Sequence, residues 1–227
     1  MSVELVKFTT YLSILIQFVT GIFGFVGLTY KLPAPHNLLT KSLTIEMIVQ
    51  AIEFVFYIGI IAYFNLRNMA TIRYYDWFIT TPTMLFTTCL VYYYLYQVEQ
   101  KQNKDITLQQ FVKEHRDSLT LILVANFMML LFGYLGEKHL IDKVSAFIIG
   151  SGFLALSFYI IYRDFARYLK EQTYLFTILC VVWATYGVVF LFPTVYKNIA
   201  FNFLDIIAKN FFGLFLYYKI ITIHKQL

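Results

Sequence analysis

The sequence predicts an all-α membrane protein: a bundle of seven transmembrane helices with the N-terminus outside the cell and the C-terminus in the cytoplasm. Three observations lead to this fold class. Hydrophobic residues make up 59% of the chain and charged residues only 14%, whereas soluble domains are about 25% charged. Seven apolar runs are each long enough to cross a bilayer, which takes about 20 helical residues. Lysine and arginine are distributed unevenly among the segments that connect these runs.

The predicted spans follow one another along the whole chain, at residues 6–29, 43–64, 71–97, 118–136, 142–162, 172–193 and 198–222. The first span contains Lys7 and is followed by no small-residue cleavage signal, so we expect it to be retained rather than removed as a signal peptide. The connections are short, which predicts one seven-helix domain over residues 1–227. The longest connection, from Gln97 to Asp117, is polar and mixed in charge, and we expect a solvated loop there.

Basic residues indicate the orientation of the bundle. When lysines near the ends of spans are counted with the adjoining side, eleven of the 18 lysines and arginines lie on the side of the C-terminus and five on the opposite side, and the remaining two, Arg73 and Lys209, are counted as intramembrane. Cytoplasmic loops carry the excess of lysine and arginine in membrane proteins, so this asymmetry places the C-terminus in the cytoplasm. The net charge of +5 is accordingly a topology signal, and we expect no nucleic-acid partner.

A charged pair lies within the last span, at Asp205 and Lys209. A charge at the bilayer centre costs at least about 2.5–3.5 kcal/mol, so an intramembrane lysine is by default a functional residue. Its amine can form a Schiff base with an aldehyde. A carboxylate four residues earlier lies on the same helix face and can neutralise the resulting cation.

The third span carries a polar stripe whose members recur at three- and four-residue steps: Arg73, Asp76, Thr80, Thr83 and Thr87. Arg73 and Asp76 can partly neutralise each other, and the adjacent Trp77 offers a flat apolar wall. Taken alone, the stripe is explained equally well by a structural ion-pair cluster between helices.

The motifs of three spans together resemble those of the microbial (type 1) rhodopsins. The third span reads Arg-Tyr-x-Asp-Trp-x-x-Thr-Thr-Pro from Arg73 to Pro82, and the seventh has Asp-x-x-x-Lys, ending at Lys209. The sixth follows the family pattern Trp-x-x-Tyr-Pro-x-x-Trp through Trp183, Tyr186 and Phe190, with Gly187 replacing the proline and Phe190 the second tryptophan. The resemblance covers the whole chain, and the two departures bear on the shape of the pocket and its colour.

The resemblance implies that Lys209 carries all-trans retinal as a protonated Schiff base. It makes Asp76 the primary counterion and proton acceptor, with Thr80 beside it, and Asp205 the second counterion. Arg73 is expected to organise the outer half of the site. Trp77 and Trp183 would sandwich the polyene. The other implied pocket residues are Tyr186, Phe190, Thr81, Met84 and Met129, with Gly133 and Leu154 near the ring end.

The resemblance leaves the mode of ion transport open, because the family includes proton, chloride and sodium pumps, channels and photosensors. Asp76 keeps a carboxylate at the proton-acceptor position, which argues against chloride pumping. Thr87 stands where a proton pump would carry its cytoplasmic donor acid. Lys197 stands on the outer side, where such a pump often has a glutamate. Two acidic residues that a fast proton pump uses are therefore absent from their usual positions.

The second span adds an acidic stripe on one helix face, formed by Glu46, Gln50, Glu53 and Tyr57. Rows of carboxylates attract cations in pores. Polar residues of the first and last spans are expected to face this stripe: Ser13, Gln17, Asn202 and Asn210. Glutamates along this helix are typical of channelrhodopsins, and the short chain with Thr87 resembles viral rhodopsins. We therefore expect a light-gated cation channel.

Two alternatives stay open beside the channel. If Glu46 and Glu53 are protonated core residues, Glu46 could replace the missing donor of an outward proton pump. The third alternative is a photosensor that acts through a partner. We expect no enzymatic activity and no metal site, and Asn126 is expected to contact Thr81 across helices. The predicted surroundings are the lipid bilayer of the plasma membrane or another host membrane, the transported species are cations or protons, and homo-oligomerisation is left open.

Overall fold

The computed structural model describes residues 2–101, 106–169 and 173–226. Its α-helices are α1 (Val3–Thr29), α2 (Asn37–Ala62), α3 (Leu66–Glu99), α4 (Leu108–Glu114), α5 (Arg116–Glu137), α6 (Lys143–Asp164), α7 (Thr173–Phe190), α8 (Thr194–Asp205) and α9 (Phe211–His224). Short 3₁₀ turns cover Ala34–His36 and Ala166–Tyr168. A π-helical turn, Ile206–Asn210, joins α8 and α9 into one rod.

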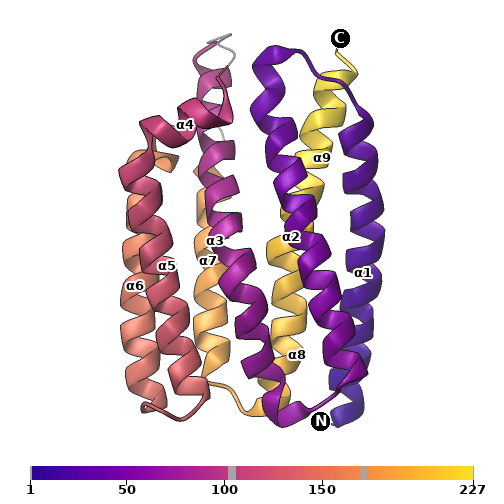
Figure 1. Ribbon diagram of the computed structural model, residues 1–227, viewed down its shortest axis with the longest axis vertical. Coiled ribbons are helices and arrows are strands. Elements are labelled where there is room, and N and C mark those ends of the chain that lie inside the picture. The colour runs from indigo at the N-terminus through magenta and orange to yellow at the C-terminus, as the bar shows by residue number, and fades with distance from the viewer. Residues whose placement is uncertain (1, 102–105, 170–172, 227) are drawn as a thin grey trace.

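The long helices stand side by side, with the N-terminus at the lower end and the C-terminus at the upper end of the bundle (Figure 1). The predicted spans correspond to α1, α2, α3, α5, α6, α7 and the α8–α9 rod, so the all-α, seven-helix fold class is confirmed. The third span is longer than predicted, since α3 begins at Leu66 rather than at residue 71. Two of the lysines counted for orientation, Lys104 and Lys170, lie outside the described residues, and the orientation stays a prediction.

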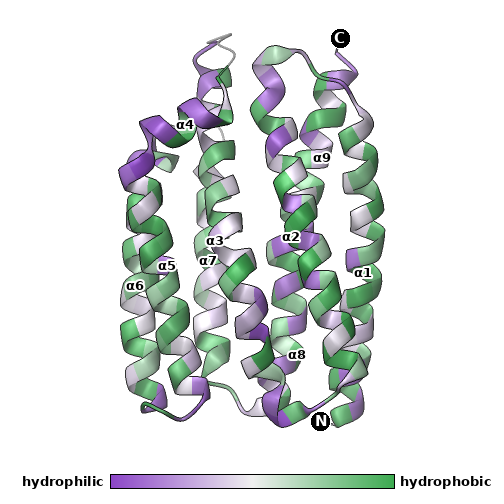
Figure 2. Ribbon diagram, in the orientation of Figure 1, coloured by the Kyte–Doolittle hydropathy of each residue, from purple (hydrophilic) through white to green (hydrophobic). Residues whose placement is uncertain are grey.

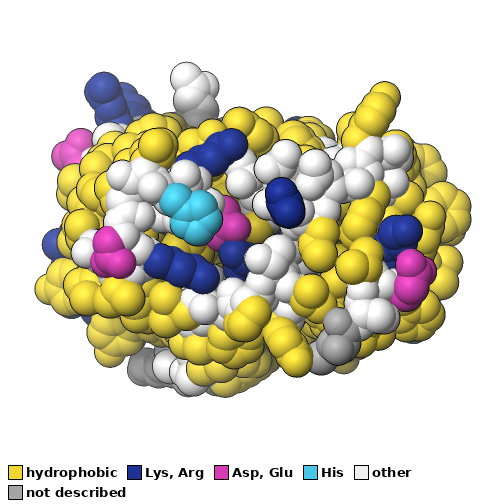
Figure 3. All heavy atoms as spheres, turned by 90° about the horizontal axis from the view of Figure 1, so that it is seen from below, with side chains coloured by type: hydrophobic (Ala, Val, Ile, Leu, Met, Phe, Trp, Pro, Cys, Tyr) yellow, Lys and Arg dark blue, Asp and Glu magenta, His cyan; other side chains and the backbone are white. Residues whose placement is uncertain are grey.

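The bundle exposes apolar side chains and buries polar ones, which is the arrangement that a lipid environment favours. On α1, for example, Phe8 and Leu15 are more than half exposed, whereas Thr10, Ser13 and Gln17 are buried. Charged side chains of both signs are interspersed over the N-terminal end (Figure 3). Among the described residues, six helical segments are long and apolar enough to cross a membrane. The chain is therefore a multi-pass integral membrane protein.

The helix α3 is too polar to be counted among these six segments, and its position in the bundle explains why. Its polar stripe, which includes Arg73, Asp76 and Thr80, is buried against other helices rather than exposed to lipid. It packs against α2, α5 and α8. A helix that its neighbours surround can carry charges that a lipid-facing helix cannot, because the bundle supplies their partners.

The connection from Gln97 to Asp117 is not the plain solvated loop that its composition predicts. It contains α4, a polar helix that lies across the upper end of the bundle (Figure 2). The Thr107 hydroxyl accepts a hydrogen bond from the backbone N–H of Gln110, whose side chain accepts one from the Thr107 N–H, so the helix start is a capping box. Phe111 is fully buried and packs against Phe86, so one apolar residue anchors the helix.

Candidate functional site: a buried lysine in an aromatic pocket

Lys209 lies in the π-helical turn between α8 and α9, close to the middle of the bundle. Its side chain is only 2% exposed. The Nζ atom donates a hydrogen bond of 2.8 Å to Oδ2 of Asp76 on α3. A buried amine requires a partner of opposite charge, and this contact supplies it. The predicted pairing of Lys209 with Asp76 is therefore present as a direct ion pair.

A second carboxylate approaches the same amine from α2. Glu53 Oε1 lies 3.4 Å from Lys209 Nζ. The Glu53 side chain is fully buried, and neither of its oxygens accepts a hydrogen bond from the described part of the chain. The sequence placed Glu53 on an ion pathway and did not connect it with Lys209. It could not do so, because the contact depends on how α2 is rotated against the last helix.

Asp205 forms its hydrogen bonds in a different network from Lys209. Its Oδ2 accepts hydrogen bonds from Arg73 Nη1 at 2.8 Å and from the Tyr57 hydroxyl at 2.6 Å, and its Oδ1 accepts one from Tyr186 at 2.7 Å. Asp205 forms no salt bridge with Lys209, contrary to the expectation from their four-residue spacing. The physical reason is the π-helical turn, whose wider winding changes the relative direction of residues that an α-helix would stack. Its role as a second counterion stays a prediction.

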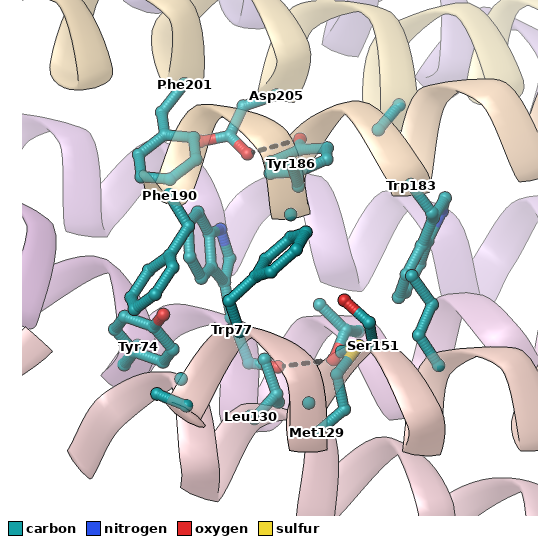
Figure 4. A pocket seen from close by; sticks show the side chains of 18 of the residues that line it. Tyr74, Trp77, Met129, Leu130, Ser151, Trp183, Tyr186, Phe190, Phe201 and Asp205 are labelled. Atoms are coloured by element: carbon teal, nitrogen blue, oxygen red, sulfur yellow. Dashed lines mark hydrogen bonds between the residues drawn. The ribbon is translucent and has the colours of Figure 1, made fainter. Parts of the chain in front are cut away.

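An apolar cavity extends from Lys209 between α3, α5, α6 and α7. All ten residues predicted for the cofactor line it: Lys209, Trp77, Trp183, Tyr186, Phe190, Thr81, Met84, Met129, Gly133 and Leu154. Figure 4 shows the labelled aromatic side chains converging around this space. Trp77 packs edge-to-face against Tyr186, with ring centroids 5.6 Å apart. Such a wall holds a flat apolar ligand and excludes water.

Sequence reasoning missed several residues of the cavity wall. Phe201 and Tyr74 pack against Trp77 on two sides, with ring centroids 5.0 and 5.1 Å away. A Cβ atom added to Gly133 would lie 2.6 Å from the Tyr74 hydroxyl, so this glycine makes room for the tyrosine. Phe201 occurs one helical turn before Asp205, which is the one sequence signal that could have pointed to it.

Residues 4–223 match the model of the bacteriorhodopsin-like protein family. The chain belongs to this family. It is thus a microbial rhodopsin, as the motifs of the third, sixth and seventh spans predict. A comparison with curated protein sequences found no match.

Solved structures of other rhodopsins share the fold over almost the whole chain. The viral rhodopsin OLPVRII is 26% identical, with a TM-score of 0.83 over 96% of this chain and 99% of that one. The rhodopsin of Exiguobacterium sibiricum is 17% identical, with a TM-score of 0.74 over 97% and 98%. The proton-pumping rhodopsin AR2 of the marine alga Acetabularia acetabulum is 20% identical, with a TM-score of 0.71 over 99% and 98%. The last two likenesses concern the fold alone.

The remaining predicted site residues of this rhodopsin are all buried. The Thr80 hydroxyl donates to the backbone oxygen of Asp76 at 3.0 Å, not to its carboxylate. Arg73 also donates to the side-chain oxygen of Asn202, so it links α3 to α8. The expected contact across helices is confirmed, since Asn126 Nδ2 donates to the Thr81 hydroxyl at 2.9 Å.

The predicted polar row of this rhodopsin forms cross-links between α1, α2 and the last rod. Gln50 Nε2 donates to the backbone oxygen of Gln17 at 2.6 Å and to the side-chain oxygen of Asn210 at 3.1 Å. Gln17 in turn donates to the Ser13 hydroxyl at 3.1 Å. Nearer the N-terminal end, Asn202 Nδ2 donates to the Thr9 hydroxyl at 2.7 Å. The predicted facing of these helices is confirmed.

Two acids have partners that the sequence did not reveal. Glu46 on α2 accepts a hydrogen bond from the Thr87 hydroxyl on α3. Glu137, at the end of α5, accepts from Lys197 Nζ with both oxygens at 2.6 Å. Lys197 is thus buried in an ion pair rather than exposed at an outer surface. An acid does lie beside it, although 60 residues separate the two in the chain.

Proposed function

We propose that this protein is a light-responsive membrane protein that holds all-trans retinal on Lys209. Members of the family bind retinal through a Schiff base to a lysine, and Lys209 is the one amine among the residues that line the aromatic cavity. Asp76, at 2.8 Å, provides the negative charge that a protonated Schiff base requires. When bound, retinal supplies a light-driven change of shape beside the Lys209 nitrogen. The apolar wall formed by Trp77, Trp183 and Tyr186 keeps the group in place and water away from it.

We further propose that light opens a pathway for cations along the polar row. The observation that supports this mode is the set of buried polar side chains that α1, α2 and the last rod share. Intramembrane acids normally face a bundle interior or a wet cavity. Three cross-links close the row in turn: Glu46 to Thr87, Gln50 to Gln17, and Asn202 to Thr9. Breaking them would let water and cations enter.

An outward proton pump is the alternative function, and one contact favours it. Thr87 cannot act as a proton donor near neutral pH, but its hydroxyl donates to the carboxyl group of Glu46. The acid that a pump needs near this position could therefore stand on α2 instead of α3. In that function Glu46 would return a proton toward Lys209. The third alternative, a photosensor, requires a membrane partner.

Whole-cell voltage clamp of retinal-supplied cells under green light separates these functions. A photocurrent that reverses sign near the equilibrium potential of a cation supports the channel. An outward current at all holding potentials supports the pump, and a coloured, membrane-inserted protein without current supports the sensor. In the channel, Glu46→Gln and Glu53→Gln should alter conductance or selectivity, and unchanged currents in both would contradict the pathway.

Loss of colour in Lys209→Ala tests the retinal linkage itself. The matched control is Lys219→Ala, which removes a lysine near the end of α9 that does not line the cavity. We expect the control to bind retinal and to show the visible band of the unmodified protein. A visible band that survives in Lys209→Ala without added amine would refute the linkage.

A further inference from the structure

We propose that Glu53 is a further counterion of the Lys209 site, beside Asp76 and in addition to Asp205, which the family resemblance names as the second counterion. This inference rests on the proposed retinal linkage at Lys209 and goes beyond it. It adds a carboxylate of α2 to the counterions that the resemblance implies on α3 and the last rod. It also makes one residue common to the chromophore site and the polar row.

The first argument is the pairing of Glu53. Its side chain is completely buried, and a buried carboxylate without a partner is costly. Within the described part of the chain its oxygens accept no hydrogen bond, and its one salt bridge is to Lys209 at 3.4 Å. The carboxylate therefore relies on the charge at Lys209. The same amine also forms a salt bridge with Asp76, so two carboxylates share one cation.

The second argument is the state of Asp205. Three groups donate hydrogen bonds to it, and one of them is the Arg73 guanidinium, which is itself buried. Arg73 already compensates the negative charge of Asp205. Asp205 acts on Lys209 as well, but within the described part of the chain the direct salt bridges of that amine are to Asp76 and Glu53.

The third argument is the charge balance of the cluster. It contains two cations, Arg73 and Lys209, and three carboxyl groups, Asp76, Asp205 and Glu53. With Asp205 paired to Arg73, a buried cluster without net charge has one proton shared between Asp76 and Glu53. Two carboxyl groups at one cation titrate as a coupled pair. Glu53 then offers a second place for a proton that leaves or reaches the Lys209 nitrogen.

Glu53 has neighbours on α2 that form hydrogen bonds with other helices. Glu53 lies on α2 between Gln50, which cross-links α2 to α1 and to the π-helical turn, and Tyr57, which donates to Asp205. A change of charge at Glu53 therefore acts on both neighbours along the row. The charged groups that act on Glu53 are Asp76 on α3 and Asp205 and Lys209 on the last rod. Glu53 in turn acts on Tyr57 of α2 and Tyr186 of α7.

Absorption spectra of the purified, retinal-loaded protein test the assignment. Removing a negative charge beside the Schiff base nitrogen lowers the energy of the optical transition. We expect Glu53→Gln to move the visible band to longer wavelength by more than Asp205→Asn does, and Glu53→Asp to stay near the unmodified protein. The control Glu114→Gln removes an exposed carboxylate of α4 and should leave the band unchanged. A Glu53→Gln band at the original wavelength would overturn the proposal.

Light-minus-dark infrared spectroscopy gives a readout that does not depend on the stability of Glu53→Gln. We expect a carboxyl C=O band in the unmodified protein that changes frequency in Glu53→Asp. A band that is identical in both proteins would mean that Glu53 takes no part and would overturn the proposal. Failure of the underlying retinal linkage looks different, because the unmodified protein would then bind no retinal or Lys209→Ala would keep its colour.

Discussion

Replacing Glu137 with glutamine breaks a buried ion pair that ties the end of α5 to α8. Both carboxylate oxygens lie 2.6 Å from Lys197 Nζ. The Lys197 side chain is 4% exposed and the Glu137 side chain 10%. In Glu137→Gln the lysine keeps its charge without a partner of opposite sign. Lys143 lies close enough to repel the Lys197 ammonium, so it does not stabilise the charge that Glu137→Gln leaves without a partner.

Breaking a buried pair in this way costs about 3–5 kcal/mol of unfolding free energy. Because Glu137 retains some contact with solvent, we expect the lower end of this range, about 3 kcal/mol. For a chain of this size that corresponds to a fall in Tm of roughly 6–12 °C. The double variant Glu137→Gln/Lys197→Gln removes the stranded charge as well, so it should recover most of the loss.

Thermal unfolding in detergent, followed by far-UV circular dichroism, measures these differences. The control is Glu4→Gln, which breaks the exposed Lys7–Glu4 pair at 3.8 Å and should change the free energy of unfolding by less than about 0.5 kcal/mol. Two results would refute the reasoning: a Glu137→Gln variant as stable as the control, or a double variant less stable than the single one.

Three further predictions follow from local geometry. Gly136→Ala should destabilise the bundle by about 1–3 kcal/mol in denaturation assays, because the new Cβ would lie 2.5 Å from the Ala146 Cβ; Gly152→Ala, with nothing within 4 Å, should not. Hydrogen bonds from the first turn of α6 hold the pKa of the Asp142 carboxyl below its ordinary 3.8. The ionised carboxyl of Asp142 therefore stabilises the folded state above pH ~4, and this contribution is lost as the pH falls through the lower pKa of the folded state. The Tm difference between Asp142→Ala and the unmodified protein should shrink below pH ~4. A constant difference would contradict this reasoning. Thr87→Val removes the hydrogen bond to Glu46 and should cost about 1–3 kcal/mol, with a shifted Glu46 carboxyl band in the infrared spectrum; an unchanged band would exclude the contact.

The sequence determined the properties that depend on neighbours along the chain. Apolar runs of about 20 residues must become helices in a bilayer, because only a helix pairs its own backbone groups there. The three-residue spacing of Trp183 and Tyr186 places both side chains on one face of their helix. The Thr107-x-x-Gln110 capping box is a local signal for α4, but the prediction of a solvated loop missed this helix.

Only the tertiary structure decided which charges meet. Asp205 and Lys209 are four residues apart, yet a π-helical turn separates their partners, and Lys209 instead meets Glu53 of a helix more than a hundred residues earlier in the chain. The ion pair between Glu137 and Lys197 likewise joins two residues that are 60 positions apart in the chain. Helical periodicity assigns a side chain to a face of its own helix. The rotation and depth at which two helices pack assign that face a partner, and these depend on the side chains of the whole bundle at once.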